Sequence, residues 1–159
     1  MSLLNYSEDE RKLKKILKEI INSAAGLKNV IIIDDAGITI ISESKFKFVL
    51  DNDISVEKIG AIGGAVFTAG QEQGHILGYG NIHLQITEYD KGFLFSLKVG
   101  KGVLCIATDN NIQVGYIRVL MKKWAPIIAK ILNNYLQSDQ GEMNKELKDL
   151  FNSDTIGLF

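Results

Sequence analysis

The sequence has little of what would place it in a specialised setting, with a single cysteine, a single proline and no excess of charge of either sign. Cys105 alone excludes an intrachain disulfide framework. Lys and Arg number 18 against 19 Asp and Glu, so no overall positive field exists to hold nucleic acid or an anionic membrane. No stretch has the roughly 18 apolar residues of a spanning helix, and MSLLNYSEDERKLKK lacks the apolar run of a signal peptide. We therefore expect a cytoplasmic protein without nucleic-acid partners and without membrane insertion.

The composition is otherwise that of an ordinary folded domain. Of 159 residues, 46% are hydrophobic and 23% are charged, which is typical of a globular chain with its own core. This length suits one domain and is short for two. We expect a domain in residues 1–138 and a C-terminal extension in residues 139–159, which forms a short amphipathic helix or a mobile tail.

Hydrophobic periodicity predicts an alternation of helices and strands. A one-faced helix is expected to begin after Ser7 and to end near Gly26, with its lysines, Lys14 among them, on the solvated face. Short turns between the later strands require antiparallel neighbours. The remaining elements expected are a hairpin over 29–44, a helix from about Ser55 to Gly74, strands at 81–89, 92–99 and 102–108, and a helix from about Ile112 that contains Pro126.

The stretch GAIGGAVFTAG, residues 60–70, raises the question of a phosphate-binding loop. It fits neither the G-x-x-x-x-G-K-[ST] nor the G-x-G-x-x-G spacing, and it follows a helix start at Ser55 and not a strand. Its four glycines, with Gly70 the last, therefore lie inside a helix, where they cost about 4 kcal/mol relative to alanine. A wheel predicts a core face of Ile59, Ile62 and Val66 beside a stripe of Gly60, Gly63, Gly64, Phe67 and Gln71.

Two explanations of that glycine stripe stay open. A surface without side chains lets another backbone approach closely, which would make the stripe a docking surface. Alternatively, the glycines relieve crowding between this helix and the sheet of the same chain.

Residue types that carry chemistry are present without the partners that chemistry needs. Asp34 and Asp35 fall in a DDAG turn and are expected to be turn formers. His75 and His83 have no second ligand at metal-binding spacing, and Cys105 is expected to be a small buried hydrophobe. We therefore predict no catalytic, cofactor-binding or metal residues, and a protein that is not an enzyme.

Four stretches carry a resemblance to the roadblock/dynein light chain family, most of all to its MglB-type prokaryotic members. They are NVIIIDDAGITIIS, IGAIGGAVFTAG, GKGVLCIATD and NIQVGYIRVLMKKW, and the likeness covers residues 13–136. The resemblance implies an α/β fold of the α+β kind, ordered α-β-β-α-β-β-β-α. Its five-stranded antiparallel sheet would have one helix on one face and two on the other, and a helical tail would follow.

The same resemblance implies a homodimer that binds a small Ras-like GTPase, as a scaffold or as a regulator that stimulates GTP hydrolysis without an arginine finger. By likeness, the residues at the dimer interface would be Gly63, Phe67, Ile82, Leu84 and Ile86. Those at the GTPase docking surface would be Gly60, Ala61, Gly64, Thr68 and Gln71. Two alternatives stay open: a longin-like or profilin-like small-molecule sensor, and a subunit of a heteromeric scaffold.

Overall fold

The first helix of the computed structural model, α1 (Glu8–Ile21), has the cap that the sequence predicts. Ser7 Oγ accepts a hydrogen bond from the Glu10 amide at 3.2 Å, and acidic residues in the first turn complement the helix dipole. The helix ends earlier than expected: its C-cap is Asn22, and Gly26 lies in the turn just before the first strand. The structure describes residues 7–45, 55–137 and 150, so the expected C-terminal extension lies outside the described residues except for Leu150.

A five-stranded sheet forms the centre of the domain. Its strands are β1 (Leu27–Asp34), β2 (Thr39–Ser44), β3 (Leu84–Tyr89), β4 (Gly92–Val99) and β5 (Gly102–Asp109). Every neighbouring pair is antiparallel, and the spatial order is β2-β1-β5-β4-β3. The predicted antiparallel sheet is therefore confirmed, and β2 and β3 are its two edges.

The β1–β2 turn shows why adjacent aspartates stand there. Asp34 Oδ1 accepts hydrogen bonds from the amides of Ala36 and Ile38, both at 2.9 Å. Gly37 has a φ of +82°, which a residue with a side chain rarely adopts. The carboxylate of Asp34 thus closes the turn, as the sequence predicts.

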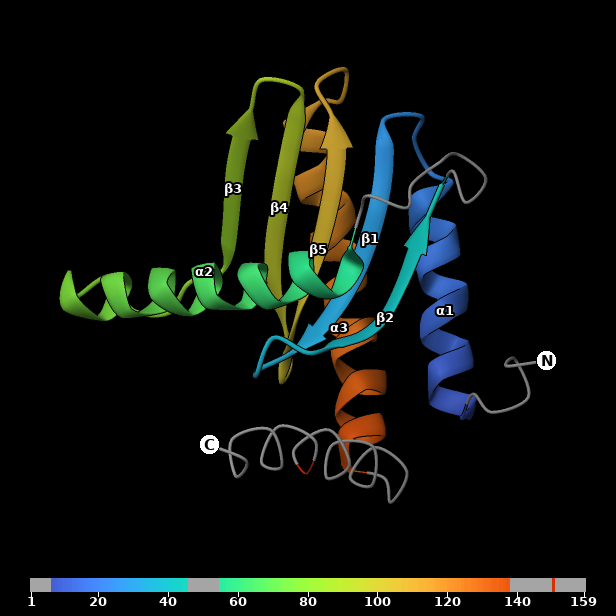
Figure 1. The fold of residues 1–159 in the computed structure, drawn as a ribbon, viewed down its shortest axis with the longest axis horizontal. Helices are drawn as coiled ribbons and strands as arrows, with labels where there is room; N and C mark the ends of the chain where they lie inside the picture. The colour runs from blue at the N-terminus through green and yellow to red at the C-terminus, as the bar shows by residue number, and fades with distance from the viewer. Residues whose placement is uncertain (1–6, 46–54, 138–149, 151–159) are drawn as a thin grey trace.

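Helices cover both faces of the sheet, with α1 and α3 (Val114–Gln137) on one face and α2 (Val56–Ile76) on the other (Figure 1). The larger core lies between the sheet and the α1–α3 layer, and includes Leu17, Phe95 and Met121. A smaller core lies under α2 and consists of Ile31, Ile33, Phe67, Val103 and Cys105. The expected arrangement of one helix against two is confirmed.

The face that α2 turns toward the sheet differs from the prediction. Gly60, Gly63 and Phe67 are buried, whereas Ile62 is 65% exposed and Val66 is 47% exposed. The predicted core face is therefore wrong for Ile62 and Val66. Small residues bring the α2 backbone close to the sheet, and the bulky aliphatic side chains are left on the outer flank.

The space around the glycines of α2 shows how closely this helix approaches the sheet. A Cβ on Gly60 would lie 2.5 Å from Thr39 Oγ1, and one on Gly64 would lie 2.8 Å from the Gly37 Cα. Neither position can therefore hold a larger residue unless the β1–β2 hairpin shifts. Of the two explanations for the stripe, relief of crowding against the chain's own sheet holds at Gly60 and Gly64.

Two further features complete the fold. The helix α3 continues through Pro126 as one element, and none of the helices within the described ranges is long and apolar enough to cross a membrane. On α1, Lys12 is exposed as expected, but Lys14 is not on a solvated face. It contacts β2, where its Nζ lies 3.0 Å from Glu43 Oε2.

Candidate interaction surfaces along helix α2

The helix α2 crosses the strands of the sheet, from the β1–β2 hairpin at its N-terminal end to beyond β3 at its C-terminal end (Figure 1). Ser55 caps its start by accepting a hydrogen bond from the Lys58 amide at 3.3 Å. Because α2 lies across the sheet, its two flanks face different parts of the strands. Each flank forms a surface of different chemistry.

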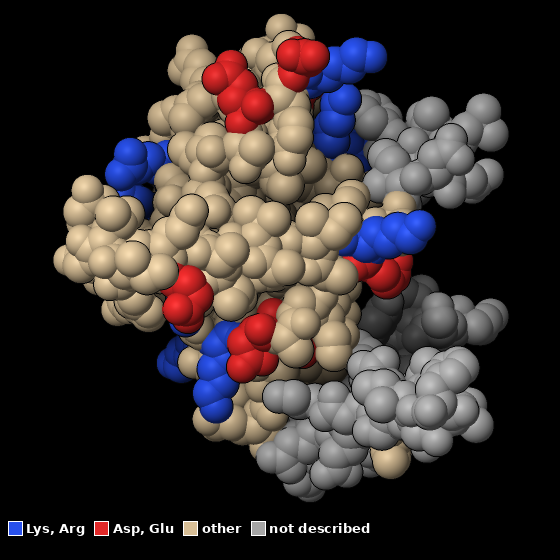
Figure 2. Space-filling view, turned by 60° about the vertical axis from the view of Figure 1, so that its left-hand side comes forward, with Lys and Arg blue, Asp and Glu red and all other residues tan. Residues whose placement is uncertain are grey.

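One flank forms an apolar groove with β3 and β4, which we call the α2–β3 groove. It has a volume of about 190 Å³ and is lined by Ile59, Ile62, Gly63, Val66, Gln85, Thr87, Tyr89, Leu94 and Ser96. None of these side chains is charged, and Figure 2 shows an uncharged surface over α2 and the strands beside it. The groove is continuous with exposed apolar residues of α2 and β3, among them Ile62 and Tyr89. An apolar surface of this kind is typical of an interaction site.

The edge of β3 beside this groove is open for pairing. In the β3–β4 hairpin, Tyr89 pairs with Gly92 across a two-residue turn, and Ile86 pairs with Phe95. Hydrogen-bonded and non-bonded pairs alternate along an antiparallel ladder, and the pair that closes a two-residue turn is hydrogen-bonded. The amide and carbonyl of Ile86 therefore point away from β4. Ile86 is also 40% exposed, so its side chain and its backbone are both accessible.

The opposite flank of α2 forms a small polar hollow beside the β1–β2 turn, which we call the turn hollow. Its volume of about 50 Å³ is too small for an organic ligand. It is lined by Asp34, Asp35, Gly64, Phe67, Thr68, Gln71, Lys98, Lys101, Gly102 and Val103. Charged groups of both signs thus surround the middle of α2 on this side, which suits polar contacts with a protein surface.

The residues predicted for GTPase docking lie along this polar flank. Gly64, Thr68 and Gln71 line the turn hollow, and Ala61 lies against the turn, with its Cα 3.4 Å from where a Cβ on Gly37 would be. Gly60 belongs to the same stripe but is buried against β1 and β2. The structure thus brings the set together on one side of α2, with Gly60 as its buried member, and the docking role stays a prediction.

The residues predicted for the dimer interface are more scattered. Gly63 lines the α2–β3 groove, Ile82 is half-buried against the small core, and Leu84 packs on the opposite, α1–α3 side. Phe67 is 3% exposed and its ring fills the core under α2, so its predicted place at the dimer interface stays a prediction. Ile86 alone combines exposure with an edge position.

Sequence reasoning missed the exposed apolar residues of the groove, chiefly Ile62, Val66 and Tyr89. The signal was present, because α2 has a stripe of glycines beside a stripe of bulky apolar residues, and only one of the two stripes can face the sheet. Once the glycines are assigned to the sheet side, Ile62 and Val66 must point outward.

Groups that could carry chemistry are few in the described part of the chain. Burial raises the pKa of the Cys105 thiol, while a hydrogen bond with Ser96, at 3.6 Å between Sγ and Oγ, acts in the opposite direction. Among the described residues no group of three His, Cys, Asp or Glu side chains is placed to hold a metal ion. The surfaces along α2 thus have the shape and side chains of binding sites.

A third concave site lies where the α1–β1 loop meets the β5–α3 loop. This loop pocket has a volume of about 360 Å³, within the range of small-molecule sites. Its lining is Ala24, Ala25, Gly26, Asp109, Asn111, Ile112, Gln113, Tyr116 and Ile117. Tyr116 Oη donates a long hydrogen bond, 3.4 Å, to the carbonyl of Ser23 at its rim.

Comparison with solved structures identifies the fold. The gliding protein MglB of Thermus thermophilus has a TM-score of 0.71 at 14% identity, covering 81% of this chain and 94% of that protein. MglB of Myxococcus xanthus also has a TM-score of 0.71, at 21% identity, over 84% of this chain and 97% of that protein. A Roadblock/LC7 domain from Streptomyces avermitilis has a TM-score of 0.61 at 12% identity, over 79% and 98%. The chain therefore has the roadblock fold in its MglB-like form.

Sequence comparison adds relatives without a described function. Two uncharacterized proteins of Methanocaldococcus jannaschii are each 26% identical to this chain, over 113 and 116 residues. The matches cover 71% and 73% of this chain, and 93% and 92% of those proteins. No family model matches the sequence.

Proposed function

We propose that this protein is a roadblock-type homodimer that binds a small Ras-like GTPase and acts as its scaffold or regulator. The observation that carries the proposal is that the open edge strand β3 lies beside an exposed apolar groove on one side of α2. The MglB-like fold supports the same assignment. The polar flank of α2 is then left for the GTPase.

The dimer would form through β3 and the α2–β3 groove. Two β3 strands in antiparallel register would satisfy each other's outward amides and carbonyls, Ile86 among them. Pairing would also bring the exposed Ile62 and Val66 of each copy into the new interface, which removes apolar surface from water. An isologous contact of this kind closes on itself and gives a dimer.

A charge placed in the groove tests the dimer. Ile62→Asp should raise the dimer dissociation constant at least about tenfold, because a carboxylate would be buried without a partner. Light scattering over a concentration series measures it, with the wild type expected near twice 17.6 kDa.

The matched control for that variant is Val119→Asp. Val119 is 68% exposed on α3, so it has similar exposure on the opposite face of the sheet. Equal dissociation constants for the two variants would reject the groove as the interface. A wild type that stays monomeric at high concentration would reject the homodimer and leave a heteromeric scaffold subunit as the alternative.

The GTPase would dock on the polar flank of α2. Ala61 and Thr68 are exposed there, and Asp35, Lys98 and Lys101 supply charges of both signs around the turn hollow. Charged rims of this kind contribute specificity and association rate more than affinity. The same contact could stimulate GTP hydrolysis only by rearranging the GTPase's own residues, because we assign no catalytic group to this chain.

The docking test uses Thr68→Arg, since the side chain at position 68 is exposed and a change there leaves the packing of α2 intact. Binding of Ras-like GTPases from the same genome, loaded with GDP or a non-hydrolysable GTP analogue, is measured by calorimetry. We expect at least about tenfold weaker binding by Thr68→Arg with an unchanged dimer. Val119→Arg is the control, and equal binding by both variants would reject this flank. Phosphate release from the loaded GTPase separates an activator from a passive scaffold.

The loop pocket favours one other function, that of a small-molecule sensor. Its volume and its mixed polar and apolar lining suit a metabolite-sized ligand. A thermal-shift screen should then find a compound that stabilises the wild type but not Tyr116→Ala. A screen in which no compound distinguishes these two proteins would remove this candidate.

A further inference from the structure

The second edge of the sheet, β2, has its own row of outward backbone groups. The Lys45 amide donates to the Lys28 carbonyl at 3.1 Å, so the backbone of Lys45 faces β1. Because direction alternates along an antiparallel pair, Glu43 shares this direction and Ser42 has the opposite one. The carbonyl of Ser42 therefore points away from the sheet. It is the acceptor that an added strand would need.

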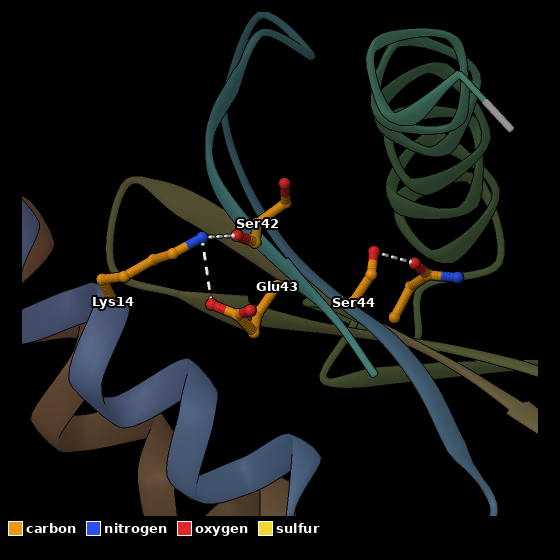
Figure 3. Close-up of polar contacts among 5 residues, drawn as sticks. Lys14, Ser42, Glu43 and Ser44 are labelled. Atoms are coloured by element: carbon orange, nitrogen blue, oxygen red, sulfur yellow. Dashed lines mark hydrogen bonds and ion pairs between the residues drawn. The ribbon is translucent and has the colours of Figure 1, made fainter. Parts of the chain in front are cut away.

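Lys14 of α1 occupies that acceptor. Its Nζ donates a hydrogen bond to the Ser42 carbonyl and also lies 3.0 Å from Glu43 Oε2 (Figure 3). The Glu43 side chain is 5% exposed and points toward α1, so it anchors the ammonium group over the edge. Figure 3 shows the lysine extending from α1 to two successive residues of β2. We call this arrangement the β2 clamp: Lys14, Ser42 and Glu43.

We propose that the β2 clamp keeps a second copy of this chain from adding a strand to β2. A strand that paired there would have to displace the Lys14 ammonium from the Ser42 carbonyl and break its ion pair with the buried Glu43 carboxylate. Inward charges and a covering helix are devices by which edge strands avoid pairing. Here the Lys14 side chain supplies both, because it carries a charge and extends from α1, the covering helix.

The clamp matters because a sheet with two open edges can grow without limit. Pairing of β2 with β2 between copies that already pair through β3 would join each subunit at both edges, and contacts of that type build open chains of subunits. With β2 blocked, pairing is confined to β3. The clamp has this role whether or not β3 itself pairs in solution.

The test replaces the ion pair with apolar residues in Lys14→Met/Glu43→Leu. Such a replacement of a buried pair commonly preserves the fold. The matched control is Lys12→Met/Glu8→Leu, which removes an exposed ion pair with a 3.4 Å separation on the same helix. Both proteins, and Lys14→Arg as the conservative variant, are compared with the wild type by sedimentation velocity over a concentration series.

We expect Lys14→Met/Glu43→Leu to form species at least about twice the wild-type mass, and the control and Lys14→Arg to match the wild type. The variant that also carries Ile86→Pro should stay heavier than Ile86→Pro alone, because pairing of β2 with β2 does not use Ile86. A folded double variant of wild-type mass would overturn the proposal, and so would a mass that falls to that of Ile86→Pro alone once Ile86→Pro is added. Should circular dichroism show the double variant unfolded, Lys14→Met/Glu43→Gln takes its place with the same criteria.

Discussion

The two edges of this sheet are opposites. At β2, a lysine from α1 covers an outward carbonyl and a buried carboxylate lies beneath it. At β3, the outward backbone groups are open, and the neighbouring groove presents Ile62 and Val66 to the outside. Whether an edge strand is free to pair thus depends on the groups around it. Both strands have six residues and both are antiparallel to one neighbour.

The largest effect is expected from proline at the two edges. Ile86→Pro removes an outward amide of β3, and the loss counts twice in a symmetric dimer. At about 1 kcal/mol per hydrogen bond, the dissociation constant should rise roughly 30-fold. Ser42→Pro removes the equivalent outward amide of β2 and should leave the mass unchanged. Light scattering distinguishes them, and equal effects of both variants would contradict the assignment of edges.

The second prediction concerns the stability that the clamp gives to its own edge. Lys14→Met breaks the ion pair with the buried Glu43 carboxylate, which should cost about 2 kcal/mol of unfolding free energy. Lys12→Met removes only an exposed pair and should change stability by less than about 0.5 kcal/mol. Urea unfolding followed by circular dichroism gives both values. A cost for Lys12→Met equal to that for Lys14→Met would mean that Lys14 acts as an ordinary surface residue.

A third prediction compares the packing of α2 against the β1–β2 turn with its packing against the middle of the sheet. Gly64→Ala would press against the Gly37 backbone and should lose about 1 kcal/mol, since overpacking outweighs the gain in helix propensity. Gly63→Ala would meet only Cys105 Sγ, at 3.9 Å, and should gain up to about 1 kcal/mol. Thermal unfolding measures the two shifts, which should have opposite signs. Shifts of the same sign would show that α2 is free to move away from the turn.

The edge variants are expected to have their smallest effect on the reactivity of Cys105, which lies on the central strand β5. Burial raises the pKa of this thiol, so the reactive thiolate becomes scarcer at any given pH in the folded state. Alkylation by iodoacetamide should therefore be slow in the native protein and fast in urea. The edge variants should leave the native rate unchanged. A faster rate in any of them would indicate a disturbed core and not an opened edge.

The sequence predicted the element order because periodicity and caps are local. Ser7 and Ser55 both cap helices, and the D-x-x-G turn closes as expected. The orientation of α2 was not predictable from periodicity, which assigns the bulkiest apolar side chains to the chain's own core. In α2 the glycines make the close contact, and Ile62 and Val66 lie on the outer flank.

Long-range pairs were also beyond sequence reasoning. Lys14 belongs to a lysine-rich helix, and nothing local separates it from Lys12 or Lys15. Its distinction comes from Glu43, which lies across the α1–β2 contact. The residues predicted for docking form a stripe on one flank of α2. The burial of Gly60 in that stripe, and of Phe67 from the predicted dimer interface, follows from the sheet beneath them. The roles proposed for both sets stay predictions.

The strand order has a consequence for how the protein is made. The helix α1 and the β1–β2 hairpin are neighbours in sequence, so the clamp on β2 can form early in synthesis. The other side of β1 pairs with β5, whose residues emerge only after α2, β3 and β4. Until then the nascent hairpin has one exposed side and one already closed. The β1–β2 hairpin of the ribosome-bound chain would thus carry a single aggregation-prone edge until β5 has been made.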